Sequence, residues 1–157
     1  MNQNYNISFT VDQSPEEVFA AITNVRGWWS EEIVGKTDEL GEFKHQYQDI
    51  HRCTMEITEL VPGKKVVWHV VDNYFNFITD NSEWKGTDIV FEIVKRGDQT
   101  EMNFTHVGLV PSYECYNVCS DAWGLNINGS LRRLISEGKG QPHLNDQIVH
   151  NHGLENA

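Results

Sequence analysis

The sequence has few positive charges and no long apolar run. Its 12 lysines and arginines stand against 23 aspartates and glutamates, which gives a formal net charge of -11 at pH 7. Nucleic acids and anionic membrane surfaces attract proteins through clustered Lys and Arg, so we expect neither as a partner. Insertion into a membrane is not expected either, because no apolar run approaches the roughly 18 residues that span a bilayer.

Motifs typical of enzymes and of secretion are also missing. The sequence contains no Gly-rich phosphate loop, no serine nucleophile elbow and no paired catalytic carboxylates. We therefore expect no cofactor, and a binding protein is favoured over an enzyme, although a reaction is left open. The first residues show no basic segment followed by an apolar one, as a secretory signal requires, so a cytoplasmic location is expected.

The three cysteines, Cys53, Cys115 and Cys119, form neither a CxxC pair nor a zinc-finger spacing. A disulfide framework is therefore not predicted. Cys115 and Cys119 would share one face of a helix, which is a spacing that metal ligands use. Two thiols alone do not complete a site, so we expect packed thiols and no metal.

A length of 157 residues suits one domain with a substantial core. We expect that domain over residues 1–142. Residues 143–157 are polar, carry His143, His150 and His152, and show no periodic pattern. They are predicted to form a C-terminal tail.

Alternation of apolar and polar residues predicts several strands. It is clear in Tyr5–Val11, and it returns at Phe43, His45 and Tyr47. Further strands are expected around residues 53–57, 66–71, 89–93 and 102–106. The segments 61–64 and 95–99 contain the Gly or Pro residues of tight turns, so neighbouring strands are predicted to run antiparallel.

Two helical regions are predicted. Residues 14–17, Ser-Pro-Glu-Glu, form a capping box that opens a short helix, and residues 24–27 interrupt it before a second short turn at the tryptophans. A long helix is expected from about Tyr113 to Glu137, with Gly138 as its C-cap. Three weak helix formers inside it imply a packing reason: Asn126, Asn128 and Gly129.

This order of elements predicts an α+β fold in which a curved antiparallel sheet wraps around the last helix. Four segments resemble homologues of the activator of heat-shock protein 90 ATPase: SPEEVFAAITNVRGWWS, VPGKKVVW, TEMNFTHVGL and GSLRRLISEGKGQP. The resemblance covers roughly residues 5–142. It implies the helix-grip fold of the START-like (SRPBCC) superfamily, with a cavity that binds hydrophobic molecules, and the family name implies a link to a chaperone.

The helix-grip fold implies a cavity between the sheet and the last helix, in which we expect a small apolar or aromatic molecule. Trp28 and Trp29 are adjacent, and successive residues of a helix are rotated by about 100°. One is therefore expected in the core and the other at the pocket mouth, with core packing of both as the alternative. The expected lining residues are Trp28, Trp29, Phe43, His45, Tyr47, Trp68, Phe91, Phe104, His106, Trp123 and Ile127.

His106 is in phase with Met102 and Phe104 and should face inward. It is either a core histidine with both nitrogens hydrogen-bonded, or a candidate catalytic group that orients a ligand or transfers a proton. In the second case the protein is a cyclase-like or hydratase-like enzyme in which His106 acts with His45 or Tyr47.

A third hypothesis is an interaction module. The outer face that carries Val67, His69 and Val71 is the candidate surface for a chaperone or for a second copy of the chain in a homodimer.

Overall fold

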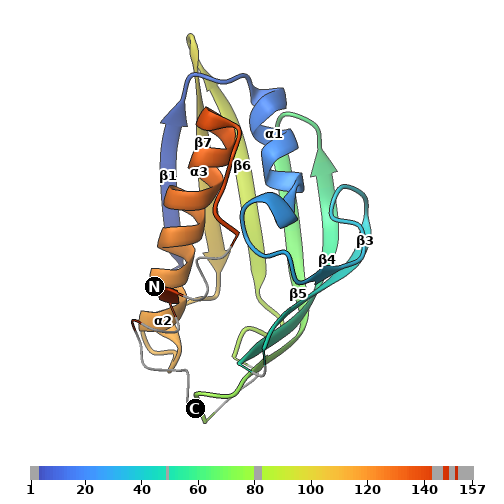
Figure 1. Ribbon diagram of the computed structural model, residues 1–157, viewed down its shortest axis with the longest axis vertical. Coiled ribbons are helices and arrows are strands. Elements are labelled where there is room, and N and C mark those ends of the chain that lie inside the picture. Colours follow the sequence, from blue (N-terminus) through green and yellow to red (C-terminus); the bar gives the residue numbers. More distant parts are fainter. Residues whose placement is uncertain (1–3, 49, 80–82, 143–146, 149–150, 152–157) are drawn as a thin grey trace.

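Seven antiparallel strands form one curved sheet in the computed structural model, which describes residues 4–48, 50–79, 83–142, 147–148 and 151 (Figure 1). The order across the sheet is β1-β7-β6-β5-β4-β3-β2, and each neighbouring pair runs antiparallel. The bounds of the strands are β1 Tyr5–Val11, β2 Ile33–Val34, β3 Gly41–Tyr47, β4 His51–Val61, β5 Lys65–Phe75, β6 Asp88–Arg96 and β7 Gln99–Val107.

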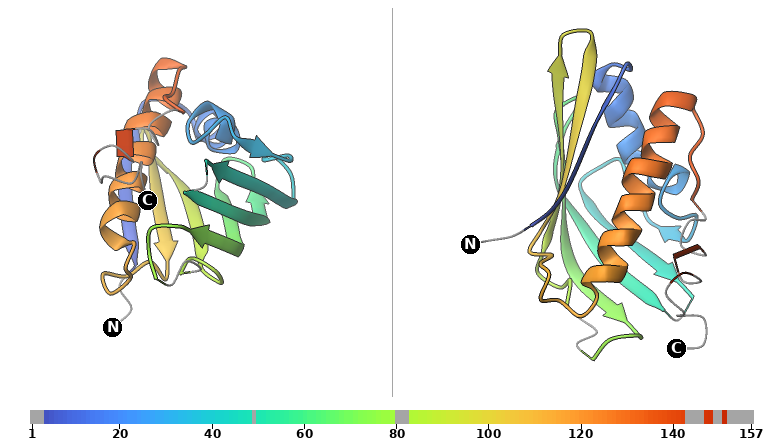
Figure 2. Two further views of the ribbon diagram at one scale, coloured as in Figure 1. Left: turned by 60° about the horizontal axis from the view of Figure 1, so that its bottom comes forward. Right: turned by 90° about the vertical axis from the view of Figure 1, so that its left-hand side faces the viewer.

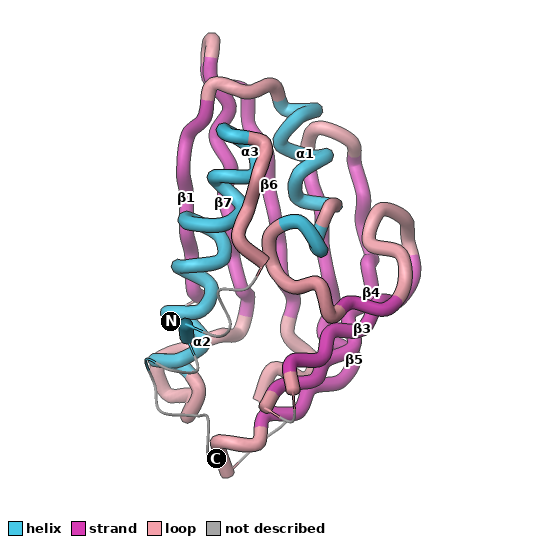
Figure 3. The backbone as a smooth tube through the Cα atoms, viewed as in Figure 1, coloured by secondary structure: helices cyan, strands magenta, loops and turns pink. Residues whose placement is uncertain are grey.

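The helices that follow β1 and β7 lie on the concave face of this sheet (Figure 2). They are α1 Pro15–Thr23, the 3-10 turn η1 Val25–Gly27, α2 Tyr116–Trp123, the π-helix η2 Gly124–Leu131 and α3 Arg132–Glu137. The last three follow one another without a break and form one long C-terminal helix (Figure 3). The predicted α+β fold, with a curved sheet around a long last helix, is confirmed.

The capping box at the start of α1 is confirmed in both directions. Ser14 Oγ accepts a hydrogen bond from the Glu17 backbone N–H at 3.2 Å, and Glu17 Oε1 accepts one from the Ser14 N–H at 3.2 Å. The helical turns end at Gly27, so Trp28 and Trp29 lie beyond a regular helix. The rotation of about 100° between successive helical residues, from which different positions of the two side chains are predicted, therefore does not apply to them. Both side chains are buried.

The predicted alternation produces one buried face along the strands. On β5 the side chains of Val66, Trp68 and Val70 are fully buried, and Trp68 pairs with Ile89 of β6, which pairs in turn with His106 of β7. The outer face of β5 carries Val67, His69 and Val71, which are all half-buried. The sheet therefore has a buried, mainly apolar inner layer and a mixed outer layer.

The C-terminal helix differs from the prediction in its middle, where eight residues form a π-helix. The weak helix formers Asn126, Asn128 and Gly129 all fall in this segment, and π-turns are tolerated where α-helical hydrogen bonding is locally weak. Asn126, Ile127, Ser130 and Leu131 are buried in it. The wider turn of the π-helix thus brings two pairs of neighbouring residues, Asn126 with Ile127 and Ser130 with Leu131, to the buried side of the helix.

After α3 the chain reverses and returns along the helix. Gly138 has a positive φ of 80°, as the predicted C-cap requires. Ser130 Oγ donates to the Trp28 carbonyl at 2.7 Å and accepts from the Gln141 N–H at 2.7 Å. Any side chain at Gly140 would collide with the Gly27 carbonyl oxygen, so the returning segment fits closely against the turn that carries the tryptophans.

Residues 143–157, predicted as a polar tail, are described only at 147–148 and 151, which are helical. Ile148 is buried, with 4% of its surface exposed, and His143, His150 and His152 lie outside the described residues. The division of the chain at residue 142 stays a prediction. Within the described part, no helix combines the length and apolarity needed to cross a membrane.

Candidate functional site

The five tryptophans of the chain form one connected cluster of ring contacts. Trp28 and Trp29 both stack on Trp68, with ring centroids 6.3 and 5.9 Å apart. Trp29 also contacts Trp123 at 5.4 Å, and Trp123 stacks on Trp84 at 5.5 Å. All five side chains are at most 4% exposed, so aromatic rings fill the centre of the molecule.

Six of the eleven residues expected to line a cavity are instead packed in the core. Each is at most 1% exposed and borders no described cavity, and Trp28 also donates from Nε1 to the Ile22 carbonyl at 3.1 Å. Side chains therefore pack closely over the middle of the sheet. The six residues are Trp28, Phe43, Trp68, Phe91, Phe104 and Ile127.

A small cavity of about 60 Å³ remains where α2 faces the start of β4, the end of β5 and the β5–β6 loop. Trp29, Tyr47 and Trp123 are the expected residues that border it. The others that line it are Ile50, His51, Phe75, Phe77, Trp84, Val118, Cys119, Ala122, Asn126 and Ile148. The wall is therefore mainly aromatic and apolar, with a few polar groups.

Two of these polar groups differ in their hydrogen bonding. His51 Nε2 is paired with Asn73 Oδ1 at 2.9 Å, and burial lowers the pKa of this histidine to about 4. Asn126 is 1% exposed, and its Oδ1 has no hydrogen-bond partner among the described residues. Such an unpaired buried acceptor costs about 1–3 kcal/mol.

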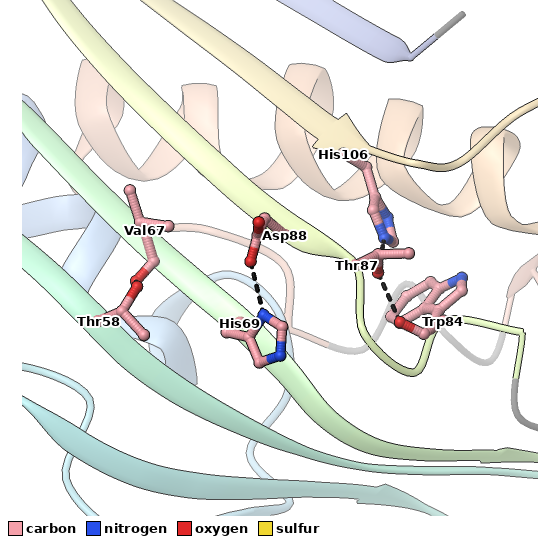
Figure 4. A network of polar contacts seen from close by, with 7 residues as sticks. All are labelled: Thr58, Val67, His69, Trp84, Thr87, Asp88 and His106. Carbon is pink, nitrogen blue, oxygen red and sulfur yellow. Dashed lines mark hydrogen bonds and ion pairs between the residues drawn. The ribbon is translucent and has the colours of Figure 1, made fainter. Parts of the chain in front are cut away.

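His106 lies behind the cavity wall and has both ring nitrogens occupied. Trp123 Nε1–H donates to His106 Nδ1 at 3.0 Å, so the proton lies on Nε2, which donates to Thr87 Oγ1 at 2.8 Å. Thr87 in turn donates to the Trp84 carbonyl at 2.6 Å (Figure 4). Burial lowers the pKa of His106 to about 3. A neutral imidazole thus connects the two wall tryptophans, and neither nitrogen is available to His45 or Tyr47.

The neighbouring residues Thr87 and Asp88 point to opposite faces of the sheet (Figure 4). Thr87 reaches His106 inside, whereas Asp88 Oδ1 pairs with His69 Nδ1 at 2.7 Å on the outer face. The outer histidine is therefore structurally separate from the cavity.

His45 stacks on Trp29, with centroids 4.3 Å apart, and its ring lies 5.2 Å from that of His51. Neither of its nitrogens has a hydrogen-bond partner in the described structure. Burial, and then the charge of His51, hold its pKa well below the usual value. His45 is therefore neutral and supports Trp29 from behind, outside the small cavity.

The loop that carries Trp84 is fixed to the start of α2. Glu83 accepts backbone hydrogen bonds from Glu114 at 2.9 Å and from Cys115 at 3.1 Å. Glu114 accepts one from the Thr79 N–H at 3.2 Å. α2 begins at Tyr116, so the Glu83 carboxylate binds the backbone N–H groups of the N-cap Cys115 and of the residue before it. It thereby ties the β5–β6 loop, which carries Trp84, to the start of α2.

The three cysteines are all free and buried. Cys119 borders the cavity, and burial raises the pKa of its thiol well above the usual value, with Cys115 adding to the effect. A neutral thiol is a poor nucleophile and a poor metal ligand. Among the described residues, no group of three His, Cys, Asp or Glu side chains could hold a metal ion.

A larger open groove of about 1020 Å³ runs along β2, β3 and the adjoining ends of β4 and β5. Its charged lining residues are of both signs and include Glu31, Glu32, Lys44, Arg52 and Asp72. The Arg52 guanidinium lies 4.5 Å from the centre of the Tyr74 ring. The groove is polar and mixed in charge, unlike the small aromatic cavity.

Several residues that line the cavity were not predicted from the sequence, for reasons that differ from residue to residue. Trp84 and Ile148 come from segments without a periodic pattern, so no signal placed them inside. His51 begins β4 just outside the expected strand. Asn126 is a weak helix former inside a predicted helix, which indicates a packing role, and the structure places it in the π-helix at the cavity wall.

Several solved structures share this fold. The Aha1 dimer from Colwellia psychrerythraea is 25% identical, covers 88% of this chain and 99% of its own, and has a TM-score of 0.70. MLL2253 from Mesorhizobium loti is 13% identical, with 85% and 96% covered and a TM-score of 0.66. CalU16 from Micromonospora echinospora is 18% identical, with 94% and 82% covered and a TM-score of 0.62. The last two likenesses concern the fold alone.

No curated protein matches the sequence. The family model described as Activator of Hsp90 ATPase homolog 1-like protein matches residues 12–136, which includes most of the sheet and nearly all of the last helix. The resemblance read from the four sequence segments is thereby confirmed, and the chain belongs to the Activator of Hsp90 ATPase homolog 1-like family.

Proposed function

We propose that the protein binds a small apolar or aromatic molecule in the cavity between α2 and the ends of β4 and β5. The observation that carries this proposal is the mainly aromatic and apolar wall of a small cavity beside a closely packed core. Ligand sites are typically concave and apolar, with a few polar groups that orient the ligand. His51 and Asn126 are polar groups of this kind.

The size of the cavity sets a condition on binding. A volume of about 60 Å³ holds roughly two water molecules, whereas an apolar cavity that binds benzene measures roughly 150 Å³. Ile148 is the one described residue beyond Pro142 that borders the cavity. We propose that a ring-sized ligand gains the room it needs by displacing the Ile148 side chain, at a cost of about 1.5–3 kcal/mol in lost burial.

The contacts of the histidines favour binding over acid–base catalysis. His106 is held by Thr87 and Trp123, and His45 lies behind Trp29. His51 borders the cavity, but its pKa of about 4 makes it a weak base at neutral pH. Efficient proton transfer requires a pKa near the working pH, which none of these environments provides.

Isothermal titration calorimetry with toluene and indole tests the proposal. Ile148→Ala enlarges the cavity and removes the cost of displacing the side chain, so it should bind toluene roughly 10- to 150-fold more tightly than the natural sequence. Ile93→Ala is the matched control, because Ile93 is a similarly buried isoleucine at 7% exposure that does not border the cavity. If neither the natural protein nor Ile148→Ala binds either compound, the proposal is wrong.

A second copy of the chain is the partner that the comparisons favour. We propose a homodimer, because the Aha1 protein from Colwellia psychrerythraea, at 25% identity, is a dimer. The half-buried Val67 and Val71 on the outer face of β5 are the apolar surface for this contact. Sedimentation velocity should show a dimer that Val67→Lys dissociates, and a monomer at high micromolar concentration would contradict it.

A further inference from the structure

Building on the proposed ligand cavity, we propose that the ligand carries a hydrogen-bond donor and that Asn126 Oδ1 accepts it. The ligand class is then a small planar aromatic alcohol or N–H heterocycle, such as a phenol or an indole, and not a pure hydrocarbon. The proposal depends on three features of Asn126: its burial, its unpaired oxygen and its position on the π-helix.

The first two features leave an acceptor that the protein does not satisfy. Asn126 is 99% buried and borders the cavity, and its Oδ1 has no partner among the described residues. Buried side-chain oxygens in native proteins are nearly always paired, and each exception calls for an explanation. An absent ligand donor at this cavity provides one.

Two N–H donors of the cavity wall are paired with other residues, and a third, Trp84 Nε1–H, has no hydrogen-bond partner among the described residues. Trp123 Nε1–H, from the same helix, donates to His106, and His51 Nε2 is paired with Asn73. The remaining wall is largely aromatic and aliphatic. A water molecule needs two to four polar partners to be held firmly, so a water beside Asn126 is readily displaced by a ligand hydroxyl or N–H.

The helix itself is built to present this residue. Asn126 lies in the π-helix Gly124–Leu131, between two glycines at positions 124 and 129, all of which are poor helix formers. The π-turn brings Trp123, Asn126 and Ile127 to the buried side together. An amide carbonyl is thereby placed beside an aromatic surface at the cavity, and π-turns of this kind are frequent at functional sites.

Phenol and toluene form the matched pair of probes, because they differ only in a hydroxyl against a methyl group. Calorimetry gives the ratio of the toluene Kd to the phenol Kd, measured both with an unchanged Ile148 and in the Ile148→Ala background. In Asn126→Leu, which keeps the shape but not the acceptor, this ratio should fall about tenfold. Asn128→Leu is the control, because Asn128 lies on the same π-helix but is exposed, and its ratio should not change.

The outcomes separate the two proposals. Binding of neither probe, even with Ile148→Ala, overturns the proposed function and this inference with it. Binding of both probes with an unchanged ratio in Asn126→Leu overturns the inference alone. If Asn126→Leu does not fold, the side-chain amide signals of Asn126 in a ¹H–¹⁵N spectrum decide: phenol should shift them and toluene should not, and equal shifts overturn the inference.

Discussion

Mild acid should destabilise this protein strongly, because at least two of its histidines are folded into the interior as neutral rings. His45 and His106 are 1% exposed or less. Burial lowers the pKa of His106 to about 3 and that of His45 well below its usual value. In the unfolded chain both titrate near 6.5.

The sign and size of the effect follow from these values. The unfolded state binds protons that the folded state does not bind, so stability is full well above pH 6.5. It is lost as the pH falls through 6.5 towards the folded-state pKa. At pH 5.5 each of these two histidines removes about 1.4 kcal/mol, and His51, with a folded-state pKa of about 4, removes a similar amount, so the three together remove about 4 kcal/mol. This is a large part of a typical stability of about 5–15 kcal/mol. Asp and Glu titrate lower, near 4, so the window from 5.5 to 6.5 isolates the histidines.

Urea unfolding followed by far-ultraviolet circular dichroism at pH 8, 6.5 and 5.5 measures this loss. In His106→Gln the amide can still donate to Thr87 and accept from Trp123 but does not titrate, so the variant should lose about 1.4 kcal/mol less than the natural protein at pH 5.5. His69→Gln, on the outer face at 40% side-chain exposure, is the control that keeps both buried imidazoles. A loss below about 0.5 kcal/mol in the natural protein, or parallel curves for it and His106→Gln, would refute the reasoning.

Three further changes test how the cavity and its surroundings are held. Ser130→Ala leaves the Trp28 carbonyl and the Gln141 N–H without their shared partner. It should lower the free energy of unfolding, measured in urea, by about 1–3 kcal/mol. Ser136→Ala, on an exposed part of α3, is the control and should lower it clearly less. Gly140→Ala places a methyl group against the Gly27 carbonyl, so it should lower the melting temperature by several degrees, and an unchanged melting temperature would show that the returning segment is not closely packed. Glu83→Ala removes the acceptor for the backbone N–H groups of Glu114 and Cys115, just before the last helix. It should cost about 0.5–2 kcal/mol and speed amide exchange at both positions; Lys85→Ala in the same loop is its control.

Much of the fold could be predicted because local rules and the tertiary structure agree. The period-two pattern of residues such as Met102, Phe104 and His106 identified the buried face of β7, and the capping box at Ser14 identified the start of α1. The interruption of the C-terminal helix was less visible. Helical periodicity assumes 3.6 residues per turn, so it could not predict a π-helix, although Asn126 and Gly129 marked the place where one formed.

The position of the cavity could not be predicted, because it depends on how large side chains fill the space inside the curved sheet. The sequence indicated that Trp28, Trp68 and Phe91 face inward. An inward-facing ring can either line a ligand cavity or pack in a filled core, and the sequence does not distinguish the two. The tryptophan cluster occupies the middle of the concave face. The cavity therefore lies at one end of the sheet, between α2 and the ends of β4 and β5. There Trp84 and Ile148 complete the wall from segments that have no periodicity to read.

The tryptophan cluster also has an optical consequence. The indole centroids of neighbouring rings lie 5.4–6.4 Å apart, close enough for their electronic transitions to couple and for excitation to pass from one ring to the next. The near-ultraviolet circular dichroism of the folded protein should therefore show the intense, paired bands of an exciton system. The emission belongs to the whole cluster, so a quencher that reaches Trp123 or Trp84 at the cavity dims the signal from Trp28 in the core as well.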